Sequence, residues 1–130
     1  MSVLYEECLM ALSDNVTVMG FNKSKIHADE FFEIFPLTSW GSVKWIEKEI
    51  LFQSSDFQSF YSFLLDYDLL NEECFVLWGD PTLPIIITNL LLLVRNIDDV
   101  TAVSFDTFIF IKEKCIFIEI RHDGTITLGC

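Results

Sequence analysis

The last stretch of the chain, residues 115–129, alternates apolar and polar side chains around His122-Asp123-Gly124. This pattern predicts an antiparallel β-hairpin, and its register can be derived. A three-residue loop with its glycine in the left-handed conformation pairs Ile120 with Ile126, so that apolar residues meet on one face. A two-residue turn would instead set Ile120 against Thr127. The three-residue loop is therefore predicted.

Hydrophobic spacing upstream of the hairpin predicts both helices and strands. Helices are expected over residues 2–12, 28–35 and 55–65, and after a cap at Thr88 or Asn89. Strands are expected over residues 15–21, 74–78, 83–87 and 101–111, and residues 40–52 weakly favour a strand. The predicted class is α+β, with a C-terminal antiparallel β-meander. Alternation implies one buried and one polar sheet face, so helices should pack on one face.

The size and apolar content predict a single domain over residues 1–130. The chain weighs 15.1 kDa, and 52% of its residues are hydrophobic, including 13 Phe. A domain of this size buries about two-thirds of its unfolded surface. No repeat or Gly/Ser-rich linker suggests a boundary.

Residues 49–94 contain seven acids and no Lys or Arg. The acids are Glu49, Asp56, Asp66, Asp68, Glu72, Glu73 and Asp80. The span is too apolar to be a disordered acidic tail, so a folded domain with a one-signed face is expected. The whole chain carries 8 basic and 20 acidic residues, a net charge of −12. This charge disfavours binding to nucleic acid or to anionic membranes and favours a basic protein partner. The simpler alternative is that the acidic composition only keeps the protein soluble.

No cofactor, metal or membrane site is predicted. The four cysteines form no C-x-x-C pair and are expected to be reduced thiols. The N-terminus lacks the basic and apolar regions of a secretory signal, and the apolar run from Leu83 to Val94 is too short to span a bilayer. A cytoplasmic protein is expected.

No catalytic residue is predicted either, and the chain is expected not to be an enzyme. His27 and His122 lie in no nucleophile motif. His27 is interpreted as a capping or surface residue, and His122 is interpreted as a turn residue. Asp106 is expected to satisfy backbone groups beside an inward-facing Phe105. The three tryptophans are expected in the core rather than at an interface.

Several segments resemble small acidic immunity proteins of bacterial contact-dependent growth inhibition (CDI) systems. The segments are Trp78-Gly79-Asp80-Pro81, Leu83-Pro84-Ile85, Ile97-Asp98-Asp99-Val100, residues 102–107 and the closing hairpin. The resemblance covers residues 77–129, and residues 1–70 show no matching motif. It implies a cytoplasmic protein that binds the C-terminal toxin domain of its cognate CDI protein, frequently a nuclease, and blocks its active site or a required surface.

The resemblance supplies no binding motif, so toxin contacts are predicted from charge alone. The predicted contacts are Asp66, Asp68, Glu72, Glu73 and Asp80, followed by Asp98, Asp99, His122 and Asp123. Two rival hypotheses are an acidic interaction or scaffold subunit for another basic protein, and an enzyme with converging carboxylates. The oligomeric state is left open. The C-terminal hairpin, if it forms a sheet edge, could pair with another strand.

Overall fold

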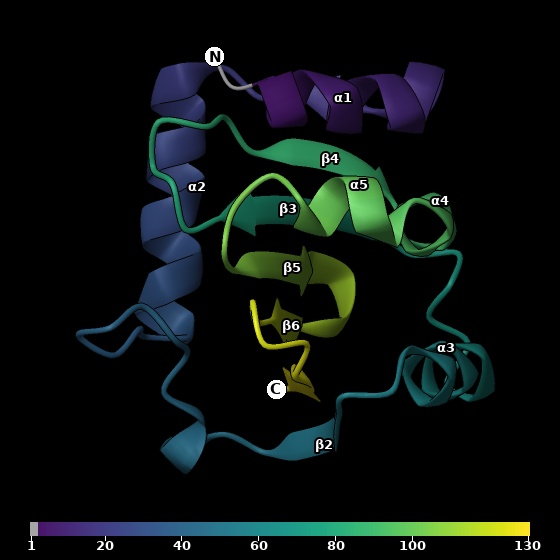
Figure 1. Cartoon of the computed structure of the whole chain (residues 1–130). Helices are drawn as coiled ribbons and strands as arrows, with labels where there is room; N and C mark the ends of the chain where they lie inside the picture. The colour runs from purple at the N-terminus through teal and green to yellow at the C-terminus, as the bar shows by residue number, and fades with distance from the viewer. Residues whose placement is uncertain (1–2) are drawn as a thin grey trace.

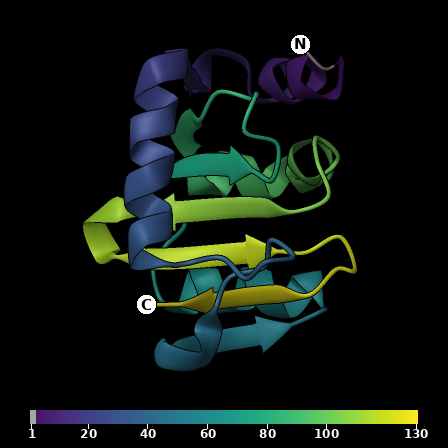
Figure 2. The ribbon, with the colours of Figure 1, turned by 90° about the vertical axis from the view of Figure 1, so that its left-hand side faces the viewer.

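A seven-stranded antiparallel sheet with the strand order β1-β4-β3-β5-β6-β7-β2 forms the centre of the protein (Figures 1 and 2). The computed structural model describes residues 3–130, so the predicted helix start at Ser2 lies outside the described residues. The strands are β1 (Thr17–Val18), β2 (Ile50–Ser54), β3 (Glu73–Trp78), β4 (Ile86–Asn89), β5 (Thr107–Ile111), β6 (Ile116–Ile120) and β7 (Ile126–Gly129). The helices are α1 (Val3–Leu12), α2 (Phe21–Ile34), α3 (Phe57–Asp66), α4 (Leu90–Arg95) and α5 (Ile97–Thr101), with 3-10 turns η1 (Ser13–Asn15), η2 (Trp45–Glu47) and η3 (Lys112–Lys114). The α+β class is confirmed.

Helices cover both faces of the sheet. α1, α3, α4 and α5 pack on the face that carries Ile109 and Ile111. α2 packs on the opposite face, where Phe31 contacts Phe110 with ring centroids 4.5 Å apart. Figure 2 shows α2 crossing the strands on this side. The prediction that one face would be polar is wrong, because β5 is apolar on both sides and the phenylalanines of α2 cover the second face.

The closing hairpin has the predicted register. Ile120 pairs with Ile126, and Gly124 has a φ of +91°. The Gly124 N–H donates to the Arg121 carbonyl at 2.9 Å, which closes the three-residue loop. The hairpin is not a sheet edge, however, because β2 pairs with β7. The free edges belong to β1 and β2.

Five predicted elements differ from the structure. The strand expected over 15–21 is reduced to β1, because α2 already begins at Phe21. The strand expected over 83–87 is shifted toward the C-terminus, since β4 spans Ile86–Asn89. The strand expected over 101–111 begins only at Thr107, because α5 includes Thr101 and residues 102–106 form a turn that leads into β5. The helix expected over 28–35 already begins at Phe21. Residues 40–52 are mostly irregular and contain η2 at Trp45–Glu47, and β2 starts only at Ile50. These segments are short and mixed in polarity, so local spacing does not determine them.

Two predicted helices are confirmed, each with a side-chain cap. Asn89 caps α4 by accepting from the N–H groups of Leu91 and Leu92. Asp56 caps α3 by accepting from the Ser59 N–H. Such caps satisfy amide donors that a first helical turn leaves free.

Candidate functional site

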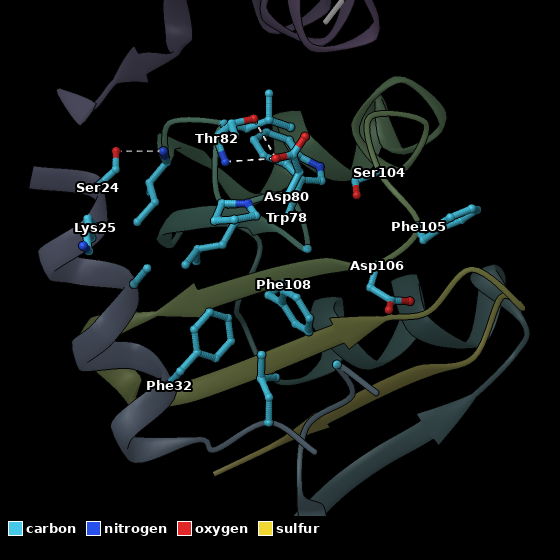
Figure 3. Close-up of a pocket in the computed structure, with 18 of the residues that line it drawn as sticks. Ser24, Lys25, Phe32, Trp78, Asp80, Thr82, Ser104, Phe105, Asp106 and Phe108 are labelled. Carbon is cyan, nitrogen blue, oxygen red and sulfur yellow. Dashed lines mark hydrogen bonds between the residues drawn. The ribbon is translucent and has the colours of Figure 1, made fainter. Parts of the chain in front are cut away.

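A pocket of about 730 Å³ opens between α2, the loop that joins β3 to β4, and the segment that leads into β5 (Figure 3). Phe32 of α2, Leu77 of β3 and Phe108 of β5 contribute apolar surface to it. Three further aromatic residues line it and are strongly exposed: Phe21 at 60%, Trp40 at 75% and Phe105 at 82%. Exposed aromatic side chains gathered around one hollow are typical of a protein-binding surface.

The β3–β4 loop holds Asp80 in a fixed turn at this pocket. Asp80 Oδ1 accepts from the Thr82 backbone N–H at 2.9 Å and from the Thr82 hydroxyl at 2.6 Å. These hydrogen bonds stabilise the carboxylate and lower the pKa of Asp80. Asp80 therefore presents a negative charge in one orientation.

Asp106 connects the pocket to the tip of the β6–β7 hairpin. Its Oδ1 accepts from the His122 backbone N–H at 3.1 Å and lies 3.3 Å from the His122 Nδ1. The backbone carbonyl of Asp106 accepts from the Gly79 N–H at 3.2 Å, which joins it to the β3–β4 loop. The prediction that Asp106 satisfies backbone groups is confirmed. The prediction that Phe105 faces inward is wrong, since this ring is exposed beside His122, with centroids 5.7 Å apart.

The charged residues that line the pocket are three carboxylates and one lysine. They are Asp29, Asp80 and Asp106, against Lys25. Negative charge beside exposed aromatic faces favours a cation, because carboxylates attract it directly and aromatic rings attract it through their quadrupole.

The predicted toxin contacts do not form one surface. Asp80, His122 and Asp123 lie at the end of the sheet that carries the pocket, where β3 and β6 end. The remaining main candidates lie at the opposite end, where α3 ends and β3 begins: Asp66, Asp68, Glu72 and Glu73. Asp80 is therefore separated from Asp66, Asp68, Glu72 and Glu73, and these acids of the span 49–94 do not form the single face that was predicted.

Asp98 and Asp99 lie in the first turn of α5, on the face opposite α2. Negative charge at this position is favourable, because the N-terminal end of a helix carries the positive end of the helix dipole. Both side chains are exposed.

Phe21, Asp29 and Trp40 of the pocket were not predicted as site residues. Trp40 was expected in the core, but it is exposed. The small or polar residues on either side of it, Thr38-Ser39 and Gly41-Ser42, are the sequence feature that could have indicated an exposed position. Trp78 is in the core as predicted, with its Nε1–H donating to the Val100 carbonyl at 2.9 Å.

Within the part of the chain that the structure describes, only histidines lie within ion-pair distance of an acidic side chain, and Arg121 acts on Glu119 and Asp123 from farther away. The two close histidine–carboxylate contacts are His27 Nδ1 with Glu30 Oε2 at 3.8 Å and His122 Nδ1 with Asp106 Oδ1 at 3.3 Å. No Lys or Arg of residues 3–130 forms an ion pair with a carboxylate. The negative charge is thus available to an external partner.

His27 was interpreted as a capping or surface residue, which is wrong. It lies within α2 and stacks on Phe75, with ring centroids 6.0 Å apart. Its Nδ1 is buried and, among residues 3–130, has no hydrogen-bond partner, since Glu30 Oε2 lies 3.8 Å away.

The described residues contain no group of three or more His, Cys, Asp or Glu side chains that could hold a metal ion. Cys8, Cys74, Cys115 and Cys130 are free thiols, the first two buried and the last two exposed. No helix within residues 3–130 is long and apolar enough to cross a membrane.

Comparison with known proteins identifies the family. No curated protein matches the chain significantly. A family profile, described as CdiI immunity protein EcoliA0-like, matches residues 1–129. The match extends the resemblance seen over residues 77–129 to the N-terminal half. Immunity proteins of this kind bind a cognate CDI toxin protein and are generally not enzymes. The chain belongs to the CdiI immunity protein family.

Proposed function

We propose that this immunity protein acts in the cytoplasm, where it binds a basic nuclease toxin domain and covers its active site or its substrate-binding surface. Inhibition is stoichiometric and needs no catalysis by the immunity protein. Family membership gives the general role of a CDI immunity protein. The nature of the toxin and the mode of inhibition are inferred from charge.

The observation that carries the proposal is a net charge of −12 with no carboxylate of residues 3–130 paired with Lys or Arg. A nuclease must present positive surface to bind phosphates. An acidic protein that approaches this surface is attracted to it and competes with the nucleic acid. Opposite fields can raise association rates toward about 10⁸–10⁹ M⁻¹s⁻¹ at low salt.

Charge alone would not hold the complex together, because exposed ion pairs contribute little to affinity. Buried aromatic anchors contribute most of the binding energy in typical interfaces. The pocket supplies such groups in Phe21, Trp40 and Phe105. Acidic regions at both ends of the sheet would therefore steer the toxin, and the aromatic side chains would retain it.

The test uses the toxin domain encoded immediately upstream of this gene. Its cleavage of RNA and DNA is measured while the immunity protein is titrated. We expect activity to fall linearly to zero at one equivalent, and cells that express both proteins to survive. An unrelated acidic protein of similar net charge is the control and should not inhibit.

The outcomes separate the parts of the proposal. Micromolar or weaker affinity, or no protection of cells, would reject neutralisation. A toxin that cleaves neither RNA nor DNA but is still neutralised would reject only the nuclease assignment. If excess nucleic acid does not slow binding of the immunity protein, the substrate surface is not the one that it covers.

A further inference from the structure

We propose that the pocket between α2, the β3–β4 loop and the segment leading into β5 receives an arginine side chain of the toxin. This inference rests on the proposed function and adds the residue type that anchors the complex. The arginine would be bound inside the pocket. Electrostatic steering of the toxin, in contrast, depends on the charge distribution of the whole protein.

The shape and apolar surface of the pocket fit a long side chain with a planar end. Phe32, Leu77 and Phe108 give it apolar walls that can cover aliphatic carbons. Trp40 and Phe105 line the pocket and are exposed, and the Phe105 ring is directed outward from it (Figure 3), so both rings are accessible for stacking on a guanidinium group at the rim. Such stacking would remove much of the exposed aromatic surface from water.

The carboxylates at the pocket have hydrogen-bonding capacity left for a ligand. Asp80 and Asp106 each use Oδ1 to bind Thr82 or His122. Within residues 3–130, Oδ2 of each accepts no hydrogen bond. Because the turn and the hairpin tip already fix these carboxylates, little side-chain entropy remains to be lost when a ligand binds.

The charge around the pocket selects a cation and disfavours an anion. Asp29, Asp80 and Asp106 outnumber the single Lys25, which lies on α2 away from Asp106 (Figure 3). Arginine suits this arrangement better than lysine, because its planar fork can bind carboxylate oxygens while its face contacts an aromatic ring. A lysine would provide only a point charge.

The test compares dissociation rates of the upstream-encoded toxin domain from four immunity proteins. These are the wild type, Asp80→Asn with Asp106→Asn, Phe105→Ala, and Asp66→Asn with Asp68→Asn. The two double variants remove the same charge from opposite ends of the sheet. Asparagine can still accept the internal hydrogen bonds at positions 80 and 106, and it tolerates the positive φ of Asp68. Phe105 is exposed, so its truncation should leave the fold intact, which thermal unfolding checks.

We expect both pocket variants to dissociate about tenfold or more faster than the wild type. The Asp66/Asp68 variant should dissociate within about twofold of the wild-type rate and should only associate more slowly at low salt. Equal dissociation from all four proteins, or acceleration only in the Asp66/Asp68 variant, would overturn the pocket assignment. A wild type that fails to bind the toxin would instead overturn the proposed function.

The identity of the occupant is tested from the toxin side. Each toxin arginine is changed to alanine, and each variant is measured with the wild-type immunity protein and with the Asp80/Asp106 double variant. One arginine should accelerate dissociation about tenfold with the wild type and have little further effect with the double variant. If every arginine acts independently of the pocket variant, the occupant is not an arginine.

Discussion

Glu119 in β6 binds the backbone N–H of Val43 through its Oε2, at 2.7 Å, and so joins residues separated by 76 positions in the sequence. Its Oε1 accepts from the Trp45 Nε1–H at 3.1 Å. Glu119 is only 2% exposed, so its carboxylate is a buried anchor for the loop that precedes β2. The same loop carries Trp40 to the pocket, which links a buried acid to the candidate binding surface.

Replacing Glu119 with alanine should lower the free energy of unfolding by about 2–3 kcal/mol. The substitution leaves the Val43 N–H and the Trp45 indole N–H without their acceptor, and removes hydrogen bonds to a charged group. Urea denaturation measures the change. Glu119→Gln is the matched control and should cost less, because its amide oxygen still accepts one of the two bonds. Equal losses in both variants would contradict this role.

The contribution of Glu119 to stability should depend on pH. Burial is the largest effect on this group and raises the pKa of Glu119, although hydrogen bonds from Val43 and Trp45 oppose it. A raised pKa means that the folded state binds the proton more tightly than the unfolded state. Stability from this group is therefore lost as pH rises from its unfolded pKa through its folded pKa.

The Glu119→Gln variant isolates this effect because it cannot titrate. Its stability relative to the wild type should improve as the pH is raised from about 4, near the ordinary pKa of Glu, toward 7. Urea denaturation across this range measures the difference. A constant difference, or a change in favour of the wild type, would show that burial does not disfavour the Glu119 carboxylate.

Gly129→Ala should destabilise the protein by about 1–3 kcal/mol through overpacking. A Cβ atom at Gly129 would lie 2.8 Å from the Trp45 ring and would also overlap the Glu49 carbonyl oxygen. It would therefore disturb the pairing of β2 with β7. Gly79→Ala is the control, since the nearest atom to its Cβ would be the Ser104 hydroxyl oxygen at 3.9 Å. Similar unfolding midpoints for both variants would contradict the close packing at Gly129.

Two of the four cysteine thiols should react readily with a thiol reagent, and the other two should be protected by burial. Cys115 and Cys130 are exposed, whereas Cys8 and Cys74 are buried. Burial raises the pKa of Cys8 to about 11 and also raises the pKa of Cys74, so little thiolate forms at neutral pH. A colorimetric thiol reagent should modify two thiols quickly in the native protein and all four in denaturant. Rapid modification of more than two native thiols would contradict the burial of Cys8 and Cys74.

The sequence predicted the elements whose stability is local. The hairpin register followed from pairing Ile120 with Ile126 around one glycine. The start of α4 followed from the cap at Asn89. Residues 40–52 were not predicted well, because distant Glu119 fixes this loop. The segment following Val100 is not the strand that was predicted, for a similar reason. Trp78, which is distant in the sequence, donates a hydrogen bond to the Val100 carbonyl.

The candidate site was predicted in part. Charge and turn chemistry drew attention to Asp80 and His122, which the structure places at the same end of the sheet. The aromatic residues of the pocket were assigned to the core or overlooked, because most aromatic side chains in an apolar sequence are buried. Only the tertiary structure shows that Trp40 and Phe105 are exposed.

Electrostatic capture of a basic toxin is tested most directly by the association rate of the two proteins as a function of sodium chloride. Opposite charges on exposed surfaces attract less as salt shortens the screening distance from about 20 Å at low salt to a few ångströms near 1 M. We predict that the association rate constant falls about tenfold or more between about 20 and 500 mM salt, with little change in the dissociation rate. An association rate that is unchanged over this range would contradict electrostatic capture.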